Sequence, residues 1–117
     1  ADSALMINPA HARALYILGK WNFDITGMGA GDKAALKVLF GGMPKASLED
    51  AIQYFEKARA ADIFLMIDYL ELAKAYVKFH QTDKAIEVLN KMMKLPPRTE
   101  DDPSYKAEGK ALLASLQ

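Results

Sequence analysis

The chain has 117 residues, a length that favours one domain. Its 15 basic and 15 acidic residues cancel, which argues against general nucleic-acid binding, because that function needs an excess of positive charge. The absence of cysteine excludes disulfides and thiolate metal sites, and no apolar run approaches the ~18 residues of a membrane-spanning helix.

The start of the chain gives little information about compartment. It does not begin with Met, and no basic segment followed by an apolar one indicates a signal peptide. We therefore interpret the chain as a mature or trimmed form of a longer protein, whose remaining part could carry a signal or a membrane anchor. The localisation stays open.

The first half of the chain predicts three helices. Pro9 suits the first helical position, with Asn8 as the cap, and the apolar pattern continues to about Ile25. After a glycine-rich break, a short second helix is expected over about 32–40. Ser47 is expected to cap the third helix, with an acidic residue three positions on as a variant capping box.

The second half predicts three more helices. A very apolar fourth helix is expected over about 64–79. After a polar turn, Thr82 or Asp83 is expected to cap a fifth helix, which two prolines stop after Leu95. A sixth helix with a polar side is expected over about 103–116, and its polarity suits a terminal capping helix.

Two stretches repeat each other at a spacing of 34 residues. Ala51, Phe55 and Ala58 recur as Ala85, Leu89 and Met92. Tyr69-x-x-Leu72-Ala73-x-x-Tyr76 precedes the second set and Pro97 follows it. This arrangement follows the tetratricopeptide pattern W-x2-L-G-x2-Y, then A-x3-F, then P. Trp21, Phe55, Tyr69 and Tyr76 stand at packing positions, and we predict that they are core residues.

The repeat determines the predicted architecture, because one helical hairpin cannot bury its apolar face alone. We expect an all-α, tetratricopeptide-like right-handed stack of helical hairpins, with an inserted short helix and a C-terminal capping helix. A single helical-repeat domain would cover 1–117. Repeat one would span about 9–62 with an insert at 27–46, repeat two about 63–97, and the capping helix about 102–117.

A series of short motifs points to one family. In order along the chain these are Asn8-Pro9, Leu18-Gly19-Lys20-Trp21, the Pro-Lys-Ala-Ser-Leu-Glu-Asp-Ala segment at 44–51, Leu95-Pro96 and Thr99-Glu100-Asp101. The series resembles the C-terminal helical-repeat domain of the regulator of microtubule dynamics family, over nearly the whole chain. Lys20 stands where that family usually has Arg, and Ala30-Gly31 stand where it tends to have Trp-Leu.

The resemblance implies a binding function. The family includes a tyrosine-phosphatase-interacting protein that tethers mitochondria to the endoplasmic reticulum, and that member is implicated in phospholipid binding through this type of domain. Its receptor-binding motif and membrane anchor lie outside the domain. We do not transfer microtubule association to this chain. The cysteine-free sequence is also compatible with a bacterial relative.

No catalytic, metal or cofactor site is predicted. His11 and His80 are the only histidines and match no metal or acid–base spacing. The segment 27–33 is rich in glycine but matches neither phosphate-loop pattern, and its glycines suit a turn between helices. The sequence therefore predicts a protein that is not an enzyme and needs no cofactor.

A concave groove is the predicted binding surface, because the first helix of each hairpin lines it in this architecture. The candidate lining residues are Arg13, Tyr16, Lys20, Phe23, Ile67, Leu70, Lys74, Val77 and Lys78. This mixed apolar and basic set would suit a protein or peptide segment. The alternatives are a phospholipid, a unit that stacks on copies of itself as a homo-oligomer, and a solvated helix face without a ligand.

Overall fold

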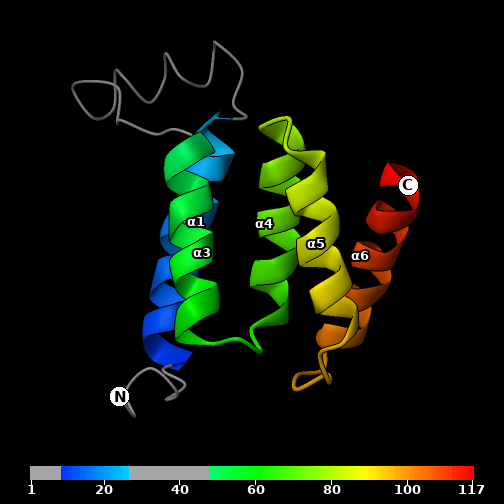
Figure 1. The fold of residues 1–117 in the computed structure, drawn as a ribbon. Coiled ribbons are helices and arrows are strands. Elements are labelled where there is room, and N and C mark those ends of the chain that lie inside the picture. Colours follow the sequence, from blue (N-terminus) through cyan, green and yellow to red (C-terminus); the bar gives the residue numbers. More distant parts are fainter. Residues whose placement is uncertain (1–8, 27–47) are drawn as a thin grey trace, which may run out of the picture.

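The computed structural model describes residues 9–26 and 48–117, and this part of the chain is all helical (Figure 1). The helices are α1 (Pro9–Thr26), α3 (Leu48–Ala61), α4 (Met66–Lys78), α5 (Thr82–Met93) and α6 (Asp102–Leu116). The expected helix at 32–40 and the expected caps Asn8 and Ser47 lie outside the described residues. No helix of the described part is long and apolar enough to cross a membrane.

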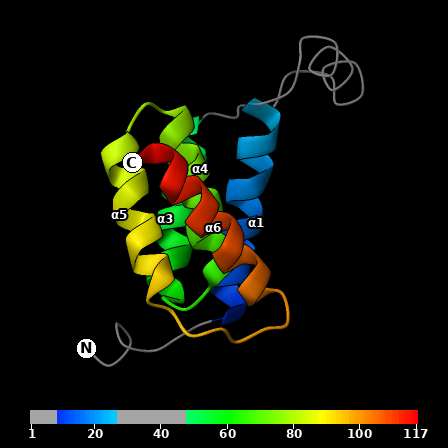
Figure 2. The ribbon, with the colours of Figure 1, turned by 90° about the vertical axis from the view of Figure 1, so that its right-hand side faces the viewer.

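The helices form a stack of hairpins. α1 packs against α3, and α4 packs against α5. α3 also contacts α4, while α6 lies against both α5 and α4. Figure 2, turned to look from the α6 end, shows α3 and α5 on the side of the stack away from α1. α1, α4 and α6 are thus the first helices of successive units.

The repeat spacing corresponds to the most buried positions. Ala51, Phe55 and Ala58 on α3, and Ala85, Leu89 and Met92 on α5, are all 0% exposed. All of these side chains except Ala58 belong to one apolar core between the two helices and α4. Each large side chain buried here contributes roughly 1.5–3 kcal/mol to folding. The sequence pattern therefore identifies the residues that hold the stack together.

Three of the four aromatic residues predicted as core are buried, namely Phe55, Tyr69 and Tyr76. The prediction for Trp21 is wrong, because its side chain is 46% exposed. α1 packs on α3 through the side that carries Gly19, whose added Cβ would lie 2.7 Å from two ring carbons of Phe55. Trp21 follows two residues later, about 200° around the helix, so it lies on another side.

The turn between α4 and α5 is built around His80, which adopts a left-handed conformation with φ 62°. The His80 N–H donates to the Val77 carbonyl (3.1 Å), and the Gln81 N–H donates to the Tyr76 carbonyl (2.8 Å). These bonds form a Schellman motif, which usually has glycine in the place of His80. Gln81 is the N-cap of α5 and makes no side-chain capping bond, so the predicted Thr82 or Asp83 cap is not formed.

Candidate functional site

The predicted groove residues lie on α1 and α4, and all but one reach the surface. Arg13 and Lys78 are exposed, whereas Tyr16, Lys20, Phe23, Ile67, Lys74 and Val77 are partly buried. Leu70 is 1% exposed and belongs to the core, which corrects its assignment to the groove lining. The Leu70 side chain points into the core between the helices, so a ligand in the groove would not reach it.

A chain of ion pairs crosses from α1 over α4 to α6. Lys20 Nζ lies 3.1 Å from an Asp24 oxygen and 2.7 Å from Glu71 Oε1. Lys74 Nζ lies 3.1 Å from Glu71 Oε2 and 2.9 Å from a Glu108 oxygen. We call these five residues the ion-pair ladder. The surface that α1, α4 and α6 share is called the first-helix face. The ladder neutralises two of the lysines that the sequence suggested for an acidic ligand.

The ladder keeps its lysines charged. Burial by itself would lower the pKa of Lys20, but hydrogen bonds to Glu71 and Asp24 outweigh this effect and raise the pKa. Burial likewise opposes the charge of Lys74, and hydrogen bonds to Glu108 and Glu71 raise the pKa of that lysine. The Glu71 side chain is only 5% exposed, and the two lysines are its ion-pair partners there.

A pocket of about 260 Å³ opens beside the ladder, at the end of the face where α1, α4 and α6 begin. Its lining is Arg13, Tyr16 and Ile17 from α1, Leu65 and Ile67 at the start of α4, Thr99 from the loop, and Asp101, Asp102 and Tyr105 around the start of α6. Aliphatic and tyrosine side chains form its walls, and Arg13 and Asp101 bring opposite charges to it. This composition suits an apolar group that carries a polar end.

Tyr16 joins this pocket to the core. Its ring lies 5.9 Å from the Phe55 ring, centroid to centroid. Burial, followed by the negative charge of Glu71, raises the pKa of Tyr16 to about 12. The phenol is therefore neutral at physiological pH and can donate a hydrogen bond to a ligand in the pocket.

Apolar and basic side chains meet at the opposite end of the first-helix face. Lys20 Nζ and Lys78 Nζ lie 5.7 Å and 5.5 Å from the centre of the Phe23 ring. Both distances fall within the range of cation–π attraction. The lysines therefore cover an aromatic ring as well as offering charge to solvent.

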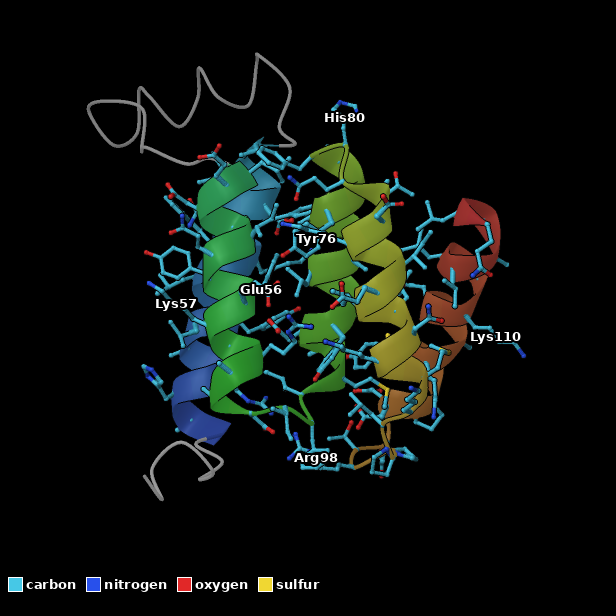
Figure 3. The ribbon with its side chains drawn as sticks, in the orientation of Figure 1. Glu56, Lys57, Tyr76, His80, Arg98 and Lys110 are labelled. Carbon is cyan, nitrogen blue, oxygen red and sulfur yellow. The ribbon has the colours of Figure 1, made fainter. Side chains whose placement is uncertain are left out.

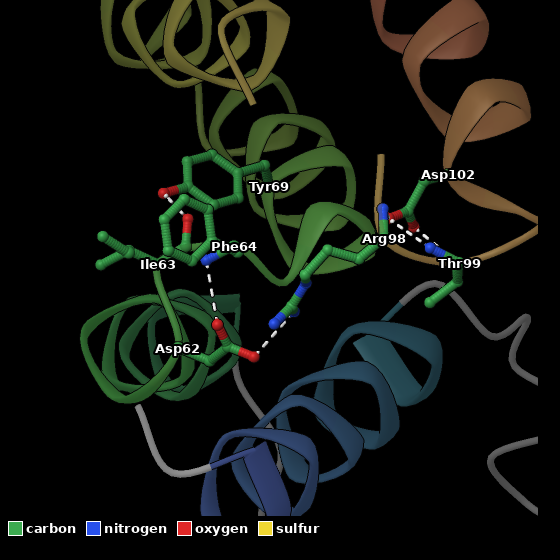
Figure 4. A network of polar contacts seen from close by, with 7 residues as sticks. All are labelled: Asp62, Ile63, Phe64, Tyr69, Arg98, Thr99 and Asp102. Atoms are coloured by element: carbon green, nitrogen blue, oxygen red, sulfur yellow. Dashed lines mark hydrogen bonds and ion pairs between the residues drawn. The ribbon is translucent and has the colours of Figure 1, made fainter. Parts of the chain in front are cut away.

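The loop before α6 is held to the stack by a polar network (Figure 4). The guanidinium of Arg98 donates to Asp62 Oδ2 (2.8 Å), and the other Asp62 oxygen accepts the Phe64 N–H (3.0 Å). Asp102 accepts bonds from the backbone N–H groups of Arg98 (2.7 Å) and Thr99 (3.1 Å). These bonds hold the pocket wall formed by Thr99 and Asp102 in place.

One buried carboxyl in α4 lacks such partners. Asp68 is 0% exposed, and neither of its side-chain oxygens has a hydrogen-bond partner among the described residues. Burial, followed by the negative charges of Glu56, Asp62 and Glu71, raises the pKa of Asp68 to about 9, although Arg59 opposes the shift. Asp68 is therefore protonated at neutral pH.

Several residues of the first-helix face were not among the predicted groove residues, and three of them matter most for its structure. Glu71 and Glu108 complete the ladder, and Tyr105 forms a pocket wall. A signal was present for Glu71, because it stands three residues before Lys74 in a very apolar helix. α6 was assigned to capping alone, so its contribution to the surface was overlooked.

Comparison with known proteins gives matches over nearly the whole chain. The family described as regulator of microtubule dynamics protein 1-3 matches residues 1–117. Regulator of microtubule dynamics protein 1 of Mus musculus is 31% identical over 116 residues, which cover 98% of this chain and 38% of the mouse protein. The Caenorhabditis elegans protein of the same name is 27% identical over 112 residues, 96% of this chain and 50% of that protein.

A second member type also matches. Regulator of microtubule dynamics protein 2 of Bos taurus is 26% identical over 117 residues, 99% of this chain and 28% of the bovine protein. The chain thus spans only half or less of the lengths of these relatives. Because the family match extends over the whole sequence, this chain belongs to the regulator of microtubule dynamics family.

Proposed function

We propose that this chain is a non-enzymatic interaction module that binds a protein segment on the first-helix face. The observation that carries the proposal is the pocket at the start of α1, α4 and α6, which is open, largely apolar and about 260 Å³ in volume. The relatives are named as regulators of microtubule dynamics, and regulation of that kind favours protein partners over a reaction.

The expected ligand follows from the charges around the pocket. Lys20 and Lys74 are engaged by the ladder, so they contribute little net positive charge. The Arg13 side chain makes no hydrogen bond or ion pair with any other described residue, and it stands at the pocket. We infer a segment that places a large apolar side chain between Tyr16 and Tyr105 and an acidic group near Arg13.

Selection of peptides from a random display library against the purified chain tests the proposal. Selected peptides should share an acidic residue close to a large apolar residue. Arg13→Glu should weaken their binding by tenfold or more in fluorescence polarisation, because it reverses the charge that faces the acidic group. Lys57→Glu is the matched control, since Lys57 lies on the side of α3 that faces away from α4 (Figure 3).

Two results would contradict the proposal. One is a peptide whose affinity is unchanged by Arg13→Glu. The other is a purified chain that carries phospholipid in native mass spectrometry and binds peptide only after the lipid is removed. The second result would support the phospholipid alternative, with Arg13 beside the phosphate.

A further inference from the structure

The α6 end of the stack carries a second, larger hollow, of about 620 Å³. Its apolar lining is Met93 at the end of α5, Pro97 in the loop, and Pro103, Ala107 and Leu113 on α6. Lys106 and Lys110 also line it, and Figure 3 shows Lys110 pointing away from the stack. We call this hollow the α6 groove. It follows α6 over about ten residues, roughly 15 Å of helix.

The α6 groove lies where the second helix of a third hairpin would pack. α1 packs against α3 and α4 packs against α5, so each of these first helices has a second helix beside it. Among the described residues α6 has no such second helix, and the α6 groove lies where one would pack, against α6 and the end of α5. Its shape and composition therefore suit an apolar helix.

An exposed apolar helix side is present at the other end of the same chain. Ile17, Leu18 and Trp21 on α1 are 58%, 45% and 46% exposed. We call these three residues the α1 stripe, since they follow one side of the helix at spacings of three and four. An exposed Trp beside two large aliphatic residues is typical of a surface that another protein covers.

The α6 groove and the Asp24 end of the α1 stripe carry opposite charges. Two lysines and no carboxylate line the α6 groove. Asp24 follows the α1 stripe one turn after Trp21. Its carboxylate is more than half exposed and pairs with Lys20 at 3.1 Å, but the ion-pair ladder holds three acids and two lysines and so keeps a negative excess. A helix that places the α1 stripe in the α6 groove can therefore bring an acidic residue to two basic ones.

We propose that the α6 groove binds the α1 stripe of a second copy of this chain. The contact joins different surfaces on the two copies, so it is head-to-tail. In a pair of copies, one copy still has a free α6 groove and the other a free α1 stripe. The assembly extends as a chain of copies or closes as a ring. In this contact α1 of one copy occupies the place beside α6 of the next copy where a second helix would pack. Ile17 belongs both to the α1 stripe and to the lining of the pocket between Tyr16 and Tyr105, so the contact covers one edge of that pocket.

The sequence offers an internal reporter, because Trp21 is its only tryptophan. In the wild type, the mass in sedimentation velocity should rise with protein concentration, and Trp21 emission should shift to shorter wavelength as the indole leaves water. Leu18→Glu breaks the α1 stripe and Ala107→Glu breaks the α6 groove. Both residues are exposed, so the variants should fold, which circular dichroism checks.

Mixing the two variants gives the decisive result. Each alone should stay monomeric, whereas a 1:1 mixture should form a heterodimer, because Leu18→Glu retains the α6 groove and Ala107→Glu retains the α1 stripe. Lys57→Glu, on α3, should associate like the wild type. A wild type that stays monomeric at millimolar concentration overturns the proposal and leaves the α6 groove to another chain segment. Self-association of either variant alone overturns it too, in favour of a contact between like surfaces.

Discussion

Lys20 of α1 and Glu71 of α4 are joined by an ion pair of 2.7 Å, and this pair is the centre of the ion-pair ladder. Glu71 is nearly buried, so it has lost most of its water and depends on the lysines for compensation. The pair links the first hairpin to the second at a place where α1 and α4 have few other contacts. Two of the three lysines predicted for the groove, Lys20 and Lys74, therefore join neighbouring helices of the stack.

Replacing Glu71 tests this role. Glu71→Gln should lower the free energy of unfolding by about 1–3 kcal/mol, because it removes charged hydrogen bonds to both lysines. Glu108→Gln is the matched control, since it removes a bond to the same Lys74 from a side chain that is 58% exposed. Glu108→Gln should lower the free energy of unfolding by no more than about 1 kcal/mol. Equal losses in urea unfolding would contradict the idea that Glu71 is the central member.

Asp68 gives a prediction about pH. Its pKa rises from 3.8 to about 9 on folding, so between these values the folded protein holds a proton that the unfolded chain has released. The free energy of unfolding should therefore fall as the pH rises, by up to about 1.4 kcal/mol per pH unit from this group. Asp68→Asn should remove that part of the slope and stabilise the protein at pH 8.

Chemical unfolding at several values between pH 5 and pH 8 measures this slope. Asp83→Asn serves as the control, because it makes the same chemical change at an exposed acid on α5 that lacks the burial of Asp68. An Asp68→Asn variant with the slope of the wild type would show that Asp68 is ionised in the folded protein.

The two buried helix glycines should respond differently to an added methyl group. At Gly19 a Cβ would lie 2.7 Å from two ring carbons of Phe55, which is fully buried and has no room to move. Gly19→Ala should cost about 1–3 kcal/mol despite the better helix propensity of alanine. At Gly109 the nearest atom is Met92 Sδ, also at 2.7 Å, on a flexible side chain that can shift.

Gly109→Ala is thus the matched control for Gly19→Ala, and its change in stability should be within about 1 kcal/mol of zero. Thermal unfolding of both variants checks the pair. A Gly19→Ala variant as stable as the wild type would mean that α1 can move away from α3 at little cost.

The sequence allowed prediction of those features that depend on local spacing. The 34-residue period identified the fully buried positions such as Phe55 and Leu89, because equivalent residues of stacked hairpins face the same core. Helix limits were predicted within two residues for α4, whose apolar run is long. The family resemblance rested on motifs spread along the chain, and the family match confirms it.

Features that depend on how helices are turned toward each other were not predicted. Lys20 and Glu71 are 51 positions apart, and no local pattern shows that their side chains meet. Trp21 matched a packing position, but on α1 that side has no neighbouring helix among the described residues. The large hollow beside α6 was also missed, since it needs the end of α5 and a face of α6 together.

His80 offers a route to a more stable variant. A non-glycine residue in the left-handed region pays roughly 1–2 kcal/mol, because its Cβ crowds the backbone. Glycine removes that crowding but is more flexible when unfolded, which offsets about 0.5–1 kcal/mol of the gain. His80→Gly should therefore raise the free energy of unfolding by about 0.5–1 kcal/mol, measured in urea. His80→Ala keeps a Cβ in the same conformation and should give no gain. A less stable glycine variant would mean that the imidazole makes contacts worth more than the backbone strain it carries.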